Sequence, residues 1–486
     1  MSIVVKQSFF NLITIGIAFI IGAVNTLYLY PTFLGSKLQG LVIALLAISN
    51  LIQPFLSFGT QHAVIRFYSR YKSKKEKDAV LTLSLIIPFI ITIIVIPIFY
   101  FYYEQIKNVL FQSENTLSQY AYVIIFIAVS TSFFEIFYSW VRVKLKSVFG
   151  NFLKELYPRL LITSLLISYT LDFLNFESFI LFLIYGYYLR LLIVIIYSFI
   201  INKPKINFSF KKDFKEIFKY SFLILLSGAA SSIILDIDKS MLSSILTIEN
   251  VAYYSVAIFI AAVIEIPGRA MFQILSPIVA EVINKNNKKK LKYLLKKSST
   301  NLVLISSLFF LIINLNLNDF YEMLNQEGYS KGIPIVIVVS FAKLYSMSIG
   351  CVNSIITNSK YYYFIFWFSI ISSVLAVVLN LYLIQDYGII GAAYATFLVI
   401  LIMNSLKLYL VKIKFKIHPY SYDTIKIAIL TTFIYVIFLN LKLTFEPVIS
   451  IAVKSTLILI LYTLAAYIFK LSNDVNIFFD KFNKNW

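Results

Sequence analysis

The chain has 486 residues, of which 60% are hydrophobic and 14% are charged. Soluble domains average roughly 45–50% apolar and about 25% charged residues, so this composition excludes an ordinary soluble protein. Apolar runs continue to the C-terminus, which excludes a single signal peptide or anchor. A transmembrane β-barrel would show alternating segments of ~10 residues instead of continuous runs. We therefore expect an all-α polytopic membrane protein.

The formal net charge of +20 would suggest nucleic-acid binding in a soluble protein. Here the Lys and Arg residues lie in short loops between apolar runs, where they set membrane orientation, and we expect no nucleic-acid partner. Cys351 is the single cysteine, which excludes an internal disulfide and a cysteine metal cluster. His62 and His418 have no ligand spacing. We expect no metal site, no cofactor and no catalytic residue.

Segments of ~20 apolar residues, the length needed to cross the hydrocarbon core, predict about fourteen spans. The first runs too long for a signal peptide and lacks a small-residue cleavage site, so we interpret it as a permanent span. The predicted spans begin near residues 9, 38, 79, 117, 155, 179, 219, 250, 298, 332, 361, 387, 423 and 447.

The connections between these spans alternate in charge. Every second connection is rich in Lys and Arg, except the one between the tenth and eleventh spans, which has Lys360 alone, and the other connections hold most of the loop acids. Because positive loops stay in the cytoplasm, this pattern predicts that both termini are cytoplasmic. The basic connections are residues 66–78, 141–154, 202–219, 285–297 and 407–416.

Two stretches of similar pattern, residues 34–58 and 246–270, occupy matching positions in the two halves of the chain. Each has a small residue six positions from its start (Gly40 and Ala252) and a late proline (Pro54 and Pro267). Chance similarity of two apolar segments is the alternative. A parallel repeat predicts two lobes with a substrate site at their interface. We expect an N-terminal lobe at 1–205, a C-terminal lobe at 206–418, and two extra helices with a cytoplasmic tail at 419–486.

Three longer segments, residues 34–71, 238–282 and 380–399, resemble signatures of the polysaccharide biosynthesis or O-antigen flippase family. This family belongs to the multidrug/oligosaccharidyl-lipid/polysaccharide exporter superfamily. The resemblance implies two six-helix bundles and two further C-terminal helices in the cytoplasmic membrane of a bacterium. It implies a transporter, not an enzyme, that moves an undecaprenyl-diphosphate-linked oligosaccharide to the periplasmic leaflet. Alternating access of a cationic cavity would drive this step in O-antigen, lipopolysaccharide or other surface polysaccharide biosynthesis, beside polymerases and other assembly proteins.

Ionisable residues inside the predicted spans cost at least ~2.5–3.5 kcal/mol each and usually face an interior or an aqueous cavity. Arg190 and Lys343 lie about ten residues from either end of their spans, too deep to reach the interface cheaply. Each is either a cavity residue or half of an interhelical pair. Arg66 either contributes to the cavity or begins a basic loop.

The segment LDIDKSML, residues 235–242, places three charges in another predicted span. Asp236 and Lys239 are three apart, so they share a helix face and can pair, whereas Asp238 points roughly 200° away from Asp236. A self-neutralising pair is one interpretation. In the functional interpretation, positive potential for the substrate diphosphate comes from Arg190, Lys239, Arg269, Lys343 and Arg66.

The resemblance further implies coupling to Na⁺ or H⁺. A carboxylate, Asp236 or Asp238, would hold the cation together with Asn380 and Thr396, which fall in matching motifs. The second acid that some relatives carry near Asn380 is not evident in VLAVVLNLYLI. The choice between the two ions therefore stays open.

Two other functions fit a polytopic membrane chain. A membrane glycan polymerase or ligase would carry a large outward loop with catalytic groups, and none of the predicted loops is long enough. A small-molecule or drug exporter of the same superfamily would share the lobes but needs less positive charge in its cavity. The molecule that accumulates when the gene is removed distinguishes these functions.

Overall fold

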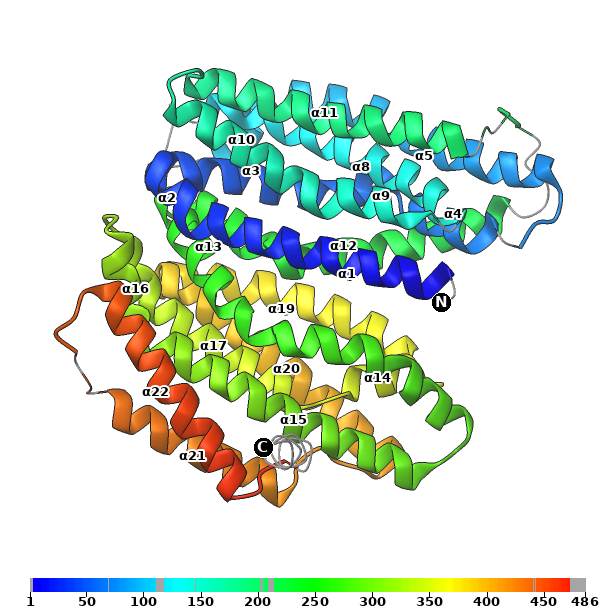
Figure 1. Ribbon diagram of the computed structural model, residues 1–486. Helices are drawn as coiled ribbons and strands as arrows, with labels where there is room; N and C mark the ends of the chain where they lie inside the picture. The colour runs from blue at the N-terminus through cyan, green and yellow to red at the C-terminus, as the bar shows by residue number, and fades with distance from the viewer. Residues whose placement is uncertain are drawn as a thin grey trace. The chain divides into compact units, whose positions relative to one another are not determined.

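The computed structural model describes residues 3–472, apart from 69, 111–117, 145, 202, 204, 209–213, 440 and 442. The described chain consists of helices and short connections, and thirteen of its helical segments are long and apolar enough to cross a membrane. The predicted all-α polytopic fold is confirmed. The chain folds into two compact units, Met1–Ser255 and Val256–Trp486, and each is described by itself below (Figure 1).

The helices of the first unit begin with α1 and end with α12. In chain order they are α1 (Ile3–Val24), the π-helical turn η1 (Asn25–Leu29), α2 (Tyr30–Phe33), α3 (Gly35–Ser57), α4 (Thr60–Tyr68), α5 (Lys74–Phe101), α6 (Tyr103–Leu110), η2 (Gln119–Ala121), α8 (Tyr122–Arg142), α9 (Ser147–Asn151), η3 (Phe152–Leu156), α10 (Tyr157–Thr170), α11 (Phe176–Ile201) and α12 (Phe214–Ile245). α13 (Glu249–Ala262) begins in this unit and ends in the next.

The fifth predicted span differs from the others. Residues 147–170 form one continuous helical segment from α9, η3 and α10. This segment is not among the thirteen candidate spans. It carries Lys154, Glu155 and Arg159 within six residues, so its first turns are too charged for a purely apolar crossing. The structure therefore has thirteen candidate spans instead of the predicted fourteen because this helical segment is too charged, and not because the helix is absent.

The second unit continues through α13 and ends with the α21–α22 pair. Its elements after α13 are η4 (Val263–Glu265), α14 (Ile266–Asn284), α15 (Lys288–Leu315), α16 (Leu317–Leu324), η5 (Tyr329–Gly332), α17 (Ile333–Ser348), α18 (Val352–Thr357), α19 (Tyr363–Tyr387), α20 (Ile389–Phe415), α21 (Tyr422–Leu439) and α22 (Pro447–Ile468). α21 and α22 both pack against α15 (Figure 1). Ile434, Ile458 and Tyr462 join this packing as buried core residues.

α11 shows how a helix with apolar residues on every side can bury one face. Tyr187, Arg190 and Val194 are buried, whereas Leu189, Leu192 and Ile196 are exposed. The two sets follow the helical spacing of three to four residues. A helix that is apolar all round is typical of a membrane span, where the outer side chains meet lipid instead of water. The polar exception, Arg190, lies on the buried side.

Gly40 lets α3 approach the turn that leads into α13. A Cβ atom at this position would overlap the backbone carbonyl of Ile248, and backbone cannot rotate away as a side chain can. Small residues at helix contacts allow this kind of close packing in membrane proteins. Gly40 is one of the two small residues of the predicted repeat.

We expect Gly40→Ala to lower the free energy of unfolding by about 1–3 kcal/mol, because the added methyl group forces a backbone shift in a packed interior. Thermal unfolding of the purified chain in detergent measures this. Gly16→Ala in α1 is the matched control, since nothing lies within 4 Å of its Cβ position. Alanine is the better helix former, so the control should unfold at the same or a slightly higher temperature. Equal losses for both variants would contradict the close approach at Gly40.

Candidate functional site

A polar cluster joins α12 to α3 in the first unit. The Asp236 carboxylate is 9% exposed and accepts a hydrogen bond from Lys239 Nζ at 2.8 Å and one from Asn50 Nδ2 at 3.2 Å. The predicted pairing of Asp236 with Lys239 is confirmed. Asn50 lies 186 residues away in sequence, and sequence reasoning missed it. The cluster compensates a buried carboxylate with one cation and one amide, as burial of charge requires.

Asp238 faces a different helix. Its Oδ2 atom accepts a hydrogen bond from the Tyr254 hydroxyl of α13 at 2.5 Å. The two carboxylates of LDIDKSML therefore have separate partners, in agreement with their predicted separation around the helix. Residues 235–242 therefore join α12 to α3 through Asp236 and to α13 through Asp238.

Arg190 lies inside the first unit, between aromatic rings. Its guanidinium carbon is 4.3 Å from the centroid of the Phe134 ring and 4.6 Å from that of Tyr187, and it donates to Thr131 Oγ1 at 3.2 Å. Its Nε atom has no hydrogen-bond partner among the described residues. At 4% exposure the side chain does not face open space in this conformation. Arg190 is thus a buried cation held by rings and a hydroxyl.

Glu135 follows Phe134 on α8 but pairs elsewhere, because its carboxylate lies 2.7 Å from Lys154 Nζ. Among the described residues, no ion pair joins a carboxylate to Arg190. Burying this cation costs free energy, and its contacts with the faces of the aromatic rings offset part of that cost.

Arg66 lies within the helix α4 and not in a loop. Its guanidinium is exposed and is 4.4 Å from the centroid of the Tyr220 ring on α12. One turn further, Arg70 pairs with Glu216 of α12 at 2.8 Å. Arg66 therefore joins α4 to α12, and Arg70, which lies just after the end of α4, joins the following connection to α12.

Two of the predicted basic residues of the second unit differ in environment. Lys343 Nζ of α17 lies 3.1 Å from Glu265 Oε2, and both side chains are 20% exposed. The interhelical pair, one of the two alternatives from the sequence, is therefore formed. Arg269 lies one turn beyond Glu265, on α14, and is exposed.

The predicted coupling residues are distributed over both units. Asn380 of α19 is fully buried and donates to the Ala376 carbonyl at 2.8 Å, and Thr396 of α20 is half-buried. Asp236 and Asp238 belong to the first unit, so a joint cation site remains a prediction. Over the described part of the chain, no group of three or more His, Cys, Asp and Glu side chains is placed to hold a metal ion.

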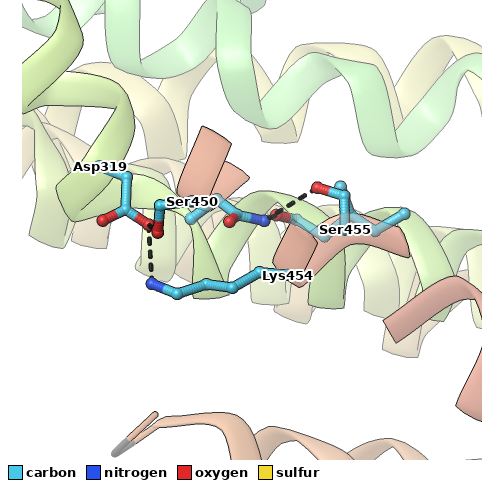
Figure 2. A network of polar contacts seen from close by, with 6 residues as sticks. Asp319, Ser450, Lys454 and Ser455 are labelled. Carbon is cyan, nitrogen blue, oxygen red and sulfur yellow. Dashed lines mark hydrogen bonds and ion pairs between the residues drawn. The ribbon is translucent and has the colours of Figure 1, made fainter. Parts of the chain in front are cut away.

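A second polar network lies in the second unit between α16 and α22 (Figure 2). Lys454 Nζ donates to Asp319 Oδ2 at 2.7 Å, and Ser450 donates to the same oxygen at 3.0 Å. Asn316 donates to Ser455 further along α22. Sequence reasoning missed this network, although a single lysine within the apolar run 447–468 is a signal of it. These hydrogen bonds hold α22 against α16.

We expect Lys454→Ala to lower the free energy of unfolding by up to about 3 kcal/mol, because it leaves Asp319 without its cation in a largely buried position. The double variant Asp319→Asn with Lys454→Met should recover most of the loss, since it removes both charges. Thermal unfolding in detergent measures both. The exposed pair Lys285–Glu281 provides the control, and Lys285→Ala should change little. A double variant less stable than Lys454→Ala would contradict the pairing.

Comparison with known proteins places the chain in a family. A family model described as polysaccharide biosynthesis protein matches residues 4–282, more than half of the chain. No curated protein matches the sequence.

Solved structures share the fold across almost the whole chain. Lipid II flippase MurJ in an inward closed conformation aligns with a TM-score of 0.73 and 19% identity, over 94% of this chain and 98% of that chain. An inward-facing multidrug resistance transporter of the MATE family and MOP superfamily aligns with a TM-score of 0.60 and 13% identity, over 82% and 94%. A MATE in the straight conformation aligns with a TM-score of 0.52 and 15% identity, over 85% and 96%. The chain shares the fold of these solved structures, and it belongs to the polysaccharide biosynthesis protein family.

Proposed function

We propose that the chain is a flippase that moves an undecaprenyl-diphosphate-linked oligosaccharide from the cytoplasmic to the periplasmic leaflet of a bacterial cytoplasmic membrane. The transported unit would serve a surface polysaccharide such as O-antigen. Membership of a polysaccharide biosynthesis family supports the pathway, and the transporter fold supports movement across the bilayer. The positive-inside pattern supports cytoplasmic termini.

The observation that carries this proposal is the buried Arg190. A guanidinium at this depth is costly, and the described carboxylates leave it without an ion pair. A diphosphate carries about two negative charges and cannot cross hydrocarbon bare. A guanidinium is suited to phosphate because it presents two parallel donors. In the proposal, opening of the first lobe uncovers Arg190 for the diphosphate.

The two lysine pairs would make binding reversible. Lys239 and Lys343 are each held by a carboxylate, Asp236 and Glu265. Both pairs are partly exposed, so a diphosphate oxygen can displace the carboxylate. The return of the carboxylate then displaces the diphosphate on the far side. Because each lysine always has an anionic partner, neither step leaves a bare cation at bilayer depth.

Coupling to Na⁺ or H⁺ would act through the same carboxylates. When Lys239 turns to the substrate, Asp236 keeps only its hydrogen bond from Asn50 and can take up a cation or a proton. In this scheme substrate binding and cation binding are linked through one ion pair.

We expect Arg190→Gln and Lys343→Gln to lower transport about 10–100-fold, the cost of losing one hydrogen-bonded charge of about 1.5–3 kcal/mol. Lys360→Gln removes one positive charge from an exposed position and should leave transport nearly unchanged. Transport is measured as flipping of the lipid-linked oligosaccharide in vesicles containing the purified variant. Equal losses in all three variants at equal protein levels would contradict the cavity assignment.

A second variant separates the proposed exchange of partners from a purely structural pair. Glu265→Gln removes the group that reclaims Lys343, so we expect tighter substrate binding and slower turnover. A merely structural pair would instead lower stability with no gain in binding. Substrate affinity and turnover measured on the same vesicles distinguish the two outcomes.

A small-molecule exporter is the alternative that the shared fold with MATE transporters allows. That function predicts that vesicles accumulate a small molecule and do not flip the lipid-linked oligosaccharide.

A further inference from the structure

A basic hollow of about 400 Å³ lies at one end of the second unit, where α15 and α21 begin and α22 ends. Five lysines line it against a single acid, Asp423. The lysines are Lys289, Lys292, Lys296, Lys297 and Lys470. None of the predicted transport residues lines it. The hollow is therefore distinct from the cationic set of the proposed function.

The hollow is also lined by polar side chains that form hydrogen bonds with one another. Ser472 donates to Asn301 Oδ1 at 2.8 Å, and Thr300 lies 3.3 Å from the Ser421 hydroxyl. Ser472 and Thr300 are both buried. These hydrogen bonds join α15 to the segments that precede α21 and follow α22. The lysine positions are thus fixed by three elements and not by one flexible loop.

An apolar groove of about 470 Å³ lies beside this hollow, between α21 and α22. Leu471 lines both. Beyond it the groove is formed by Phe433, Ile437, Leu461 and Ala465, with Lys426 near the basic end. A basic hollow beside an apolar groove matches the polarity of a phospholipid, which has its phosphate at one end and its acyl chains at the other.

We propose that this site binds an anionic phospholipid of the leaflet that faces the basic loops. The phosphate would lie among the lysines, and one acyl chain would follow the groove along α21 and α22. Basic pockets at the ends of membrane helices bind anionic headgroups by this electrostatic attraction. Lysine suits an interfacial headgroup because its compact, hydrated charge sits on a flexible stem. Bound lipid would fasten the α21–α22 pair to α15.

The charge requirement is tested with the triple variant Lys292→Gln, Lys296→Gln and Lys470→Gln in the full chain. Binding of phosphatidylglycerol to the purified protein is measured by native mass spectrometry. Each interfacial lysine contributes roughly fivefold, so we expect affinity to fall on the order of a hundredfold. Phosphatidylcholine with the same acyl chains should bind weakly to both proteins.

The matched control is Lys72→Gln, Lys74→Gln and Lys75→Gln, which removes the same charge from exposed positions in another basic connection. It should keep the affinity of the unaltered chain. Equal losses in the two triple variants would overturn the site and leave only diffuse attraction between the lipid and a basic protein.

The groove is tested separately with Ala465→Phe, which narrows it without changing charge. We expect weaker binding of phosphatidylglycerol with long acyl chains and unchanged binding of the water-soluble glycerol phosphate. If glycerol phosphate competes as well as the lipid, the site binds a free phosphate and the proposal fails. If undecaprenyl diphosphate displaces phosphatidylglycerol at much lower concentration, the site belongs to the transported substrate and the proposal also fails. Neither result depends on whether the chain flips a glycan.

Discussion

The cost of charge at bilayer depth governs how this protein is built. Asp236 has Lys239 and Asn50, Glu265 has Lys343, and Asp319 has Lys454 and Ser450. Each of these interactions joins groups on helices that lie next to one another within one compact unit, except for the local pair Asp236–Lys239. Arg190 differs from these groups, because it contacts aromatic faces and a hydroxyl instead of a carboxylate. Compensation of buried charge therefore favours the packing of these helices, and Arg190 has no ion pair with any of the described carboxylates.

The same pairs connect structure to the proposed transport cycle. An ion pair that is partly exposed is weak enough to exchange its partner, whereas the more buried Lys454–Asp319 pair is suited to holding α22 in place. The proposed substrate supplies the anion for that exchange. Membership of the polysaccharide biosynthesis family and the transporter fold are both consistent with such an exchange during transport.

The sequence predicted what depends on local pattern. Long apolar runs predicted about fourteen spans, and thirteen of these are present as long apolar helices. The three-residue spacing predicted the pairing of Asp236 with Lys239, which is confirmed. Asn50 could not be predicted, because only folding brings α3 beside α12, and no local signal marks that amide. Lys454 stands out as a lone cation in an apolar run, but its sequence position does not identify Asp319 as its partner. The fifth predicted span shows the limit of counting apolar residues, since residues 147–170 are helical despite three charges near their start.

The proposed flippase activity is tested most directly by the lipid extract of a strain that lacks the gene, analysed by mass spectrometry with assignment of each species to a leaflet. A flippase predicts that a complete oligosaccharide unit on undecaprenyl diphosphate accumulates in the cytoplasmic leaflet. The unaltered chain should clear it, and the Arg190→Gln variant should not. Accumulation in the periplasmic leaflet would instead indicate a polymerase or ligase. The absence of any lipid-linked species would contradict the flippase and favour export of a small molecule.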